Sequence, residues 1–335
     1  MPAGATPRAP LNDSHHRLSL ARIRSALTEI DPIFLGMPQF RAPGLSRRLG
    51  CDILIKDETA NALRCFKGRG ADCLLVRLAA CDGPQTLVCA SAGNFGLAMA
   101  NACQRHGRIA TVFVSRHASA ARIGQIRRHG ARVLVDGDDF DEAKAAARAY
   151  THSRSLCYIE DGNEVAISEG AGTIALELLD DLAPLDAVVL PLGNGALLAG
   201  VSRVMQANSP TTLNIGVCST RAPVMHDCWK HGGIPGTSPV TRVDTIADGI
   251  AVRIPVASAV DDLVGLVDDV LLVDDYRLLE AMRWIHEDTG LLVEPSAAAG
   301  IAAIAEHPSR FAGMRVATAL TGANPGNEQI ASLLD

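Results

Sequence analysis

Aromatic residues are scarce in this chain of 335 residues, at 4% of the total. Long apolar runs are missing too, because no stretch approaches the roughly 18–20 residues that a membrane-spanning helix needs. No charged-then-apolar signal region follows Met1, and residues 1–15, rich in Pro, Ala, His and Ser, predict a flexible lead-in. The sequence therefore predicts no membrane association.

Positive charge is also limited. The formal net charge is −6 and the pI is about 5.9, with no basic stripe along the chain. A nucleic-acid partner is not expected for such a surface. The nine cysteines are odd in number and form no Cys-x-x-Cys, so neither a disulfide framework nor a zinc site is predicted. A reducing cytoplasm is the expected location.

What the chain does contain is 48% hydrophobic residues, arranged as alternating strand and helix patterns. The predicted strands are Thr86–Ala90, Ile109–Ser115, Arg132–Asp136, Ala187–Pro191, Leu213–Cys218 and Val316–Leu320. The predicted helices are Leu97–His106, Ser119–His129, Phe140–His152, Leu197–Gln206, Tyr276–Thr289 and Ser296–His307. This alternation indicates an α/β protein with parallel sheets covered by helices on both faces. A small domain at 84–163 is predicted to be inserted into a large one formed by 1–83 plus 164–335.

Two segments connect a predicted strand to a predicted helix through glycine. Gly193–Leu197 follows an apolar strand, and the backbone amides of such a turn face anions at the helix N-terminus. It is neither a P-loop nor a dinucleotide fingerprint, since position 198 is Leu. An ordinary tight turn is the alternative. Ser91–Gly96 is the second such segment, for which a turn with a capping serine is the alternative.

Lys67 and Thr321 complete the set of candidate residues. Lys67 follows Phe66 and precedes the predicted helix that opens at Arg69. A lysine at a helix start is usually a solvated charge, whereas a buried one is readily shifted toward the neutral amine that attacks carbonyl groups. Thr321 follows the last predicted strand, where a simple C-terminal turn is the alternative.

Taken in order, these four motifs resemble the fold-type II pyridoxal-phosphate (PLP) enzymes, the tryptophan-synthase-β superfamily. The resemblance runs from about residue 30 to the C-terminus and implies two parallel-sheet, three-layer domains, PLP as cofactor, a homodimer and no appended regulatory domain. Thr245–Val252 and Val293–Gly300 resemble segments of the threonine and serine dehydratases. Serine racemases carry a second serine at Ala92, so racemisation is not expected.

The resemblance also implies residue roles. Lys67 is the expected Schiff-base lysine and catalytic residue. The expected cofactor contacts are Lys67, Phe66, Asn94, Gly193, Asn194, Gly195, Ala196, Leu197 and Thr321. The expected substrate contacts are Ser91, Ala92, Gly93, Asn94 and Phe95. Asn94 is expected to bind the ring oxygen of the cofactor, and the Thr321 hydroxyl its pyridine nitrogen.

Some residues depart from the family pattern. Phe95 replaces the usual His and Cys65 the usual Ser or Thr, which indicates a specialised substrate. Asn194 and Ala196 make the phosphate turn poorer in glycine than is usual. Cys218-Ser219-Thr220 stands where relatives often carry an acidic cation ligand, so no metal is expected.

The predicted reaction is β-elimination from a threonine- or serine-like β-substituted amino acid, giving a 2-oxo acid and ammonia. Lys67 would act as the base that removes the α-proton. A β-replacement synthase of the cysteine-synthase type remains an alternative, because the same four motifs serve it. A non-catalytic PLP-fold subunit is a second alternative. A nicotinamide enzyme is a third, disfavoured by the missing fingerprint.

Overall fold

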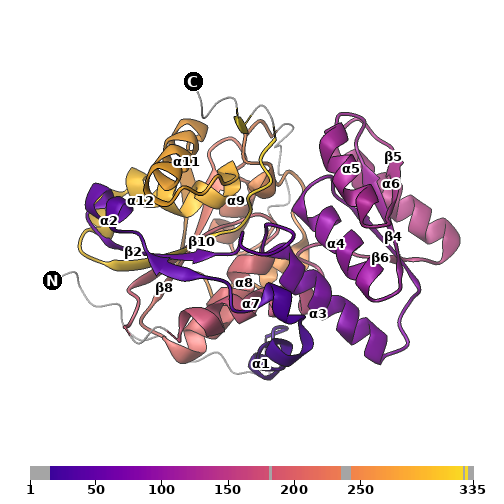
Figure 1. Ribbon diagram of the computed structural model, residues 1–335, viewed down its shortest axis with the longest axis horizontal. Helices are drawn as coiled ribbons and strands as arrows, with labels where there is room; N and C mark the ends of the chain where they lie inside the picture. The colour runs from indigo at the N-terminus through magenta and orange to yellow at the C-terminus, as the bar shows by residue number, and fades with distance from the viewer. Residues whose placement is uncertain (1–15, 181–182, 235–242, 327–328, 331–335) are drawn as a thin grey trace.

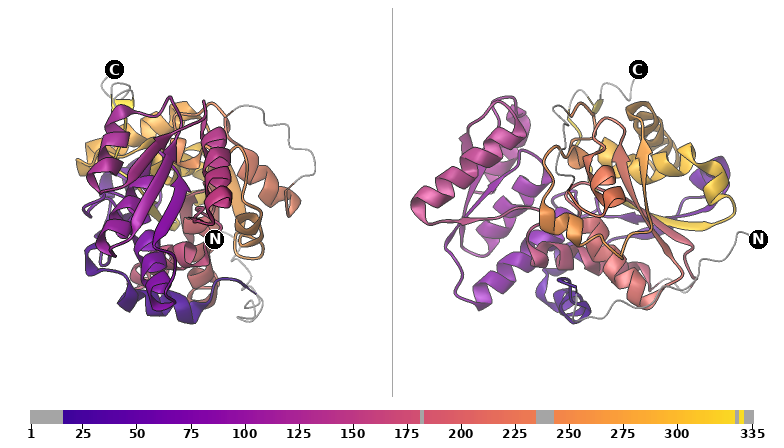
Figure 2. Two further views of the ribbon diagram at one scale, coloured as in Figure 1. Left: turned by 90° about the vertical axis from the view of Figure 1, so that its right-hand side faces the viewer. Right: turned by 180° about the vertical axis from the view of Figure 1, so that it is seen from behind.

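The computed structural model describes residues 16–180, 183–234, 243–326 and 329–330. Two β-sheets, each covered by helices, lie side by side (Figure 1). The smaller sheet and its helices, coloured magenta, form the right-hand part of that view, and the same arrangement is seen from behind in Figure 2. The predicted flexible segment 1–15 lies outside the described residues.

The large sheet has the strand order β1-β2-β10-β7-β8-β9. Its strands are β1 (Gln39–Arg41), β2 (Asp52–Asp57), β7 (Ala187–Pro191), β8 (Leu213–Ser219), β9 (Asp269–Val273) and β10 (Arg315–Leu320). Only β1 runs antiparallel, as an edge strand that the sequence did not predict. The last strand, β10, pairs with β2 on one side and β7 on the other. At the centre of the sheet, the last strand therefore pairs with a strand from the N-terminal part of the chain.

Alternate residues of the large sheet pack against two different layers of helices, as the period of a strand requires. Leu54 and Val188 belong to the core on one face, and Ile53 and Val189 to the core on the other. The first face is covered by α1 (Leu20–Glu29), α7 (Val165–Leu178), α8 (Ala196–Asn208), α9 (Val224–His231) and α10 (Ala257–Asp261). The second is covered by α2 (Pro43–Leu49), α11 (Asp275–Thr289), α12 (Ala299–Glu306) and α13 (Pro308–Phe311).

The small sheet is fully parallel, in the order β5-β4-β3-β6. Its strands are β3 (Thr86–Ala90), β4 (Ile109–Val114), β5 (Arg132–Val135) and β6 (Cys157–Tyr158). The helices around it are α4 (Asn94–Arg105), α5 (Ala120–Arg128) and α6 (Phe140–Arg154). The two central strands, β3 and β4, are largely buried on both faces, which explains the continuous apolar runs by which they were predicted.

Helix α3 (Lys67–Ala80) connects the two sheets. Its buried Leu74 and Leu75 share one apolar cluster with Leu97 of α4 and Ile167 of α7. Because the core continues across the junction, the predicted boundaries at 83/84 and 163/164 stay a prediction.

The bounds of the predicted helices differ from those of the structure by up to three residues, and the difference is largest at two of them. Helix α4 begins at Asn94, three residues earlier than expected, with Gly93 as its N-cap. The predicted helix at Ser296–His307 is divided into a 3-10 turn, Pro295–Ala298, and α12. The first difference matters for function, since it places Asn94 in the first turn of a helix. Two further 3-10 turns are η1 (Pro32–Phe34) and η2 (Asp248–Ile250).

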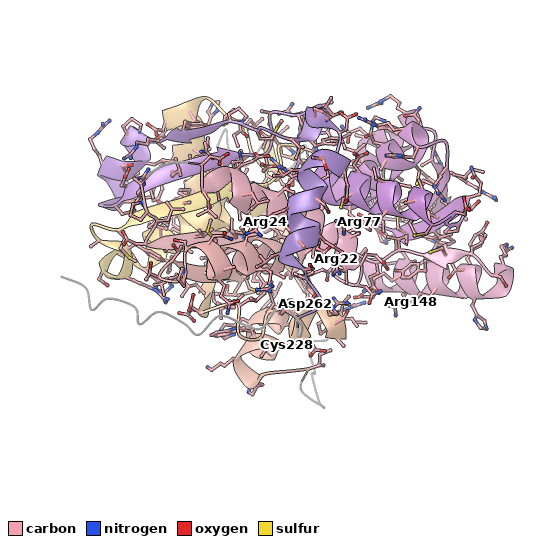
Figure 3. The ribbon with its side chains drawn as sticks, turned by 90° about the horizontal axis from the view of Figure 1, so that it is seen from below. Arg22, Arg24, Arg77, Arg148, Cys228 and Asp262 are labelled. Carbon is pink, nitrogen blue, oxygen red and sulfur yellow. The ribbon has the colours of Figure 1, made fainter. Side chains whose placement is uncertain are left out.

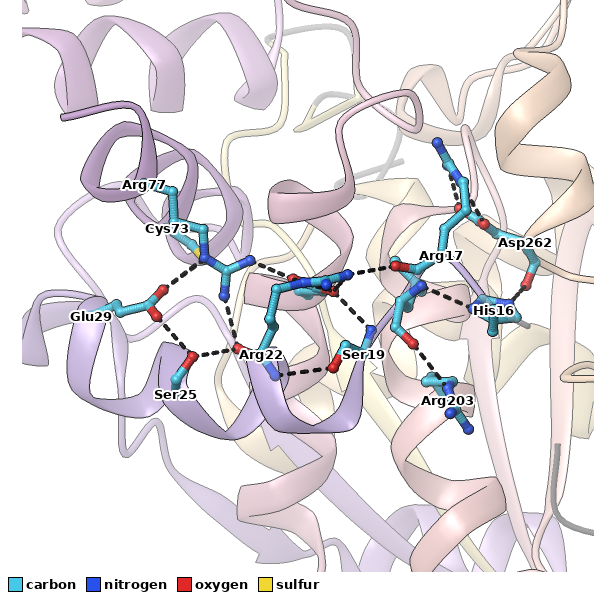
Figure 4. A network of polar contacts seen from close by, with 12 residues as sticks. His16, Arg17, Ser19, Arg22, Ser25, Glu29, Cys73, Arg77, Arg203 and Asp262 are labelled. Carbon is cyan, nitrogen blue, oxygen red and sulfur yellow. Dashed lines mark hydrogen bonds and ion pairs between the residues drawn. The ribbon is translucent and has the colours of Figure 1, made fainter. Parts of the chain in front are cut away.

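Charged side chains fasten α1 to its neighbours on the underside of the molecule (Figures 3 and 4). Glu169 of α7 is fully buried and accepts hydrogen bonds from Arg22 of α1 and Arg77 of α3. Arg77 also donates to Glu29 at 2.8 Å. Just before α1, Arg17 pairs with Asp262 at 2.5 Å. One carboxylate, Glu169, thus holds three helices together.

Candidate active site

A cavity of about 350 Å³ lies where the C-terminal ends of β3, β7 and β10 meet, between the two sheets. Ligands of parallel α/β sheets bind at this edge. The lining includes every candidate residue of the sequence analysis: Phe66, Lys67, Ser91, Ala92, Gly93, Asn94, Phe95, Gly193, Asn194, Gly195, Ala196, Leu197 and Thr321. Segments separated by more than two hundred positions are therefore brought together, while the role of each residue stays a prediction.

Lys67 is the first residue of α3, and its position depends on the end of β10. Cys65 forms a β-bridge with Gly322, and the amide of Phe66 donates to the carbonyl of Thr321 at 3.1 Å. Lys67 Nζ lies 4.6 Å from the centre of the Phe66 ring. The strand end thus fixes the backbone just before Lys67, and the Phe66 ring contacts its amine.

The partner of the Lys67 amine is Asp161, which the sequence analysis did not identify. Nζ donates to Asp161 Oδ2 at 2.6 Å. Asp161 follows β6 in the small sheet, 94 residues after Lys67. No motif marks this stretch, so sequence reasoning had no signal for it.

Arg69 anchors the first turn of α3 in a buried ionic network. It is fully buried and donates to both oxygens of Glu58 and of Glu177, while Lys56 Nζ pairs with Glu177 at 2.5 Å. Burial raises the pKa of Glu177, but the hydrogen bonds and charge of Arg69, with Lys56, outweigh it and lower that pKa to about 2. Burial raises the pKa of Glu58. The network fixes the turn that carries Lys67.

The glycine turn Gly193–Gly195 joins β7 to α8. Gly195 has φ +88°, a left-handed conformation that favours glycine, and is the N-cap of the helix. A Cβ on Gly193 would lie 2.5 Å from the carbonyl oxygen of Gly249. Glycine therefore keeps the turn close to the η2 segment. The first amides of α8 have no acceptor within the helix, and the residues that carry them line the cavity.

The segment Ser91–Asn94, between β3 and α4, forms another part of the lining. The amide of Gly93 donates to Ser91 Oγ at 3.2 Å, which orders the turn before α4. Asn94 Nδ2 donates to both carboxylate oxygens of Glu294 at 2.9 Å, and Asn94 Oδ1 accepts from Asn324 at 2.9 Å. The Asn94 amide is thus oriented by two side chains, and its predicted contact with a cofactor ring stays a prediction.

Glu294 is a further lining residue, which the sequence analysis included only as part of Val293–Gly300. It is buried, and burial together with the charge of Asp248 raises its pKa. The amide of Asn324 also donates to it, at 2.8 Å. A carboxyl group in this position holds the side chain of Asn94.

Ion pairs among the lining residues connect the helices of the small sheet to the segment 248–253. Arg122 of α5 pairs with Asp248 of η2, and Arg253 donates to Asp141 of α6 at 2.6 Å. Sequence spacing gave no signal for either pair. Within the described ranges no cluster of three or more His, Cys, Asp or Glu could hold a metal, and no helix is long and apolar enough to cross a membrane.

The donor set fits pyridoxal phosphate. One cavity is lined by three kinds of group that the cofactor needs. These are the Lys67 amine for its aldehyde, the amides at the start of α8 for its phosphate and the Thr321 hydroxyl for its ring nitrogen. The Phe66 ring beside Lys67 supplies an apolar face. A volume of about 350 Å³ is in the range of small-molecule sites.

Comparisons with known proteins agree with this fit. The family model described as "Pyridoxal-phosphate dependent enzyme" matches residues 30–322. An L-threonine ammonia-lyase of Thermotoga maritima is 31% identical over 280 residues, which cover 84% of this chain and 69% of that protein. A biosynthetic L-threonine dehydratase of Pasteurella multocida is 30% identical over 284 residues, covering 84% of this chain and 54% of the relative. The chain thus spans about half the length of the latter protein.

Solved structures show the same fold. The processed form of threonine deaminase isoform 2 from Solanum lycopersicum matches with a TM-score of 0.85 and 27% identity, covering 99% of this chain and 95% of that one. A threonine deaminase from T.th. matches with a TM-score of 0.84 and 30% identity, covering 92% of this chain and 99% of that one.

Proposed function

Since the chain belongs to the family of pyridoxal-phosphate dependent enzymes, we propose that it is an amino-acid ammonia-lyase. It eliminates the β-substituent of a threonine- or serine-like amino acid and yields a 2-oxo acid and ammonia. The observation that carries the proposal is the Lys67 amine, which lines one cavity with the Ser91–Asn94 turn and the start of α8. The names of the two relatives, an ammonia-lyase and a dehydratase, support it.

Each group has a role that follows from its position in the cavity. The Ser91–Asn94 turn binds the substrate carboxylate through its amides and the Ser91 hydroxyl. Lys67 Nζ removes the α-proton and keeps it at that nitrogen, as general base. When bound, the cofactor withdraws electrons from the α-carbon. The start of α8 holds the phosphate, where the helix dipole favours negative charge.

Thr321 and the aromatic side chains tune this chemistry. A threonine hydroxyl beside the ring nitrogen leaves that nitrogen largely unprotonated, which suits elimination more than racemisation. Phe66 and Phe95 are both largely buried, with ring centres 4.6 and 6.0 Å from Lys67 Nζ. Their rings give the amine a partly apolar surrounding, and they limit the access of water to it.

We further propose that the protein is cytoplasmic and forms a homodimer. All nine cysteines are free, which supports a reducing compartment. The dimer rests on the family resemblance, and sedimentation velocity of the purified protein tests it. A single monomeric species at micromolar concentration would contradict it.

Product analysis tests the proposed reaction. Purified, PLP-loaded protein is incubated with L-threonine, L-serine and O-acetyl-L-serine, each with and without an added thiol. A 2-oxo acid and ammonia, formed independently of the thiol, are expected. A thiol-dependent amino acid would instead assign β-replacement. Absence of any product with covalently bound cofactor would point to a specialised substrate outside these three, whereas failure to bind the cofactor covalently would support a non-catalytic subunit.

A further inference from the structure

We propose that Asp161 is a specificity-determining residue that selects substrates whose β-carbon carries a protonated amino group. The substrate class is then the L-2,3-diamino acids, in preference to the 3-hydroxy amino acids. This inference rests on the proposed function, because it assigns the substituent that leaves from the β-carbon.

The first observation is the place of Asp161 in the cavity. Its Oδ2 lies 2.6 Å from Lys67 Nζ, and only 12% of its side chain is exposed. Its Oδ1 is buried and has no hydrogen-bond partner within the described part of the chain. One oxygen of this carboxylate is thus left for a donor that the described residues do not provide.

The second observation is how the other charges of the lining are paired. Three ion pairs in the lining do not involve Lys67. They are Arg122–Asp248, Arg253–Asp141 and Lys144–Glu160. Glu294 is bound by Asn94 and Asn324. Among the described lining residues, Asp161 is the carboxylate whose ion-pair partner is the reactive lysine.

The ion pair between Asp161 and Lys67 cannot persist unchanged when Lys67 performs its proposed function. While Lys67 Nζ is covalently bonded to the cofactor, it is not a free ammonium group. Its ion pair with Asp161 is then weakened. A carboxylate that is largely buried and unpaired is unfavourable, so a new cation is needed beside it. The substrate must supply that cation.

The β-substituent is the part of the substrate suited to do so. The α-proton passes to Lys67 Nζ, and the β-carbon is bonded directly to the α-carbon. A protonated amino group there offers several donors and a full charge, and charge-assisted hydrogen bonds are about twice as strong as neutral ones. A hydroxyl offers one neutral donor, and a carboxylate would be repelled.

The chemistry balances without a further proton donor. The Cβ–N bond breaks with its electron pair on nitrogen, so the protonated amino group leaves as neutral ammonia. The α-proton is taken by Lys67 and the electron pair of the Cα–H bond forms the new double bond. One water then hydrolyses the product, and the sum is one 2-oxo acid and two molecules of ammonia. A hydroxyl, in contrast, needs a proton before it leaves as water.

The kinetic test compares L-2,3-diaminopropionate with L-serine, which differ only in the β-substituent. We expect the PLP-loaded protein to prefer the diamino acid at least about tenfold in kcat/KM. Asp161→Asn should lower kcat/KM for the diamino acid about 100-fold, as for a truncated buried charge pair, and for L-serine less than about fivefold. Asp138→Asn is the matched control, because Asp138 is exposed and pairs with Arg116 at the surface.

A binding test avoids dependence on turnover. In a Lys67→Ala background, calorimetry with PLP present measures the affinity for both amino acids. The diamino acid should bind about tenfold more tightly than L-serine, and adding Asp161→Asn should abolish this difference. The comparison of the two ligands in Lys67→Ala alone remains decisive if the double variant does not fold.

Equal affinity for the two amino acids in Lys67→Ala, or an equal loss of activity on both in Asp161→Asn, would overturn the inference. The proposed function fails on a different result. In that case no 2-oxo acid forms from any substrate, whichever amino acid binds more tightly.

Discussion

At the scale of single residues, the site depends on side chains that hold one another. Glu294 and Asn324 orient the amide of Asn94, and Asp161 binds the amine of Lys67. A side chain held by such partners loses little conformational entropy when a ligand arrives, so the site is ordered in advance. The consequences are clearest for Lys67 and Thr321, which carry the proposed chemistry most directly.

Lys67→Ala should still bind PLP, but without a covalent bond, and kcat should fall by at least about 1,000-fold because the proton-accepting amine is gone. Borohydride reduction followed by peptide mass spectrometry should place the cofactor on Lys67 in the wild type and nowhere in the variant. Lys230→Ala, in α9, is the control and should behave as the wild type. Unchanged turnover in Lys67→Ala would refute the assignment.

Thr321→Val should weaken PLP binding by roughly five- to tenfold, the value of one neutral hydrogen bond, since valine matches the shape of threonine without its hydroxyl. Thr321→Ser should restore most of the affinity. Titration of the cofactor-free proteins with PLP measures both. If valine and serine bind PLP equally well, the hydroxyl does not contact the cofactor.

At the scale of elements, turns at strand ends determine the geometry of the site. Gly193 and Gly195 allow the start of α8 to approach η2, and the Phe66–Thr321 hydrogen bond fixes the start of α3. These contacts join elements that are distant in sequence. A change in one turn therefore displaces a wall of the cavity and not only one side chain.

Gly193→Ala should reduce PLP affinity at least tenfold, because its Cβ would lie 2.5 Å from the backbone oxygen of Gly249 and one of the two segments must move. Gly233→Ala is the control, since among the described residues nothing beyond its chain neighbours lies within 4 Å of the added carbon. PLP titration of both variants gives the comparison. Equal PLP affinity in the two variants would mean that η2 moves to accommodate the added carbon while the Gly193–Gly195 turn keeps its position.

The elements were predictable to different degrees. The strands at Thr86–Ala90 and Ala187–Pro191 match the prediction because short apolar runs between turn residues leave few alternatives. Helix α7 escaped prediction, since most of its residues are buried and it shows no polar face. The fold and the lining residues that lie in the four motifs were thus accessible from sequence. The Lys67–Asp161 contact was not, because 94 residues separate its partners.

At the scale of the whole molecule, the buried network of Arg69 links stability to pH. The pKa of Glu177 is lowered to about 2 from its ordinary 4.5, so its stabilising effect is complete above about pH 4.5 and is lost as the pH falls toward 2. The free energy of unfolding therefore decreases as the pH falls through this range.

Glu177→Gln should lower the free energy of unfolding at pH 7 by about 3 kcal/mol, and the difference from the wild type should shrink between pH 5 and 3. Urea unfolding at several pH values measures it. Glu287→Gln is the control, because Glu287 is exposed and pairs with Arg48 at the surface. A difference that is independent of pH would show that Glu177 acts through packing and not through its charge.

The central place of β10 has a consequence for how the protein is made. The ribosome delivers residues 315–320 after every other strand, yet β2 and β7 find their shared neighbour only in this segment. The small sheet can be complete long before, at residue 158. A nascent chain halted before β10 carries two unfinished half-sheets with open edges, which are sites of aggregation, and it lacks the strand end that fixes Lys67.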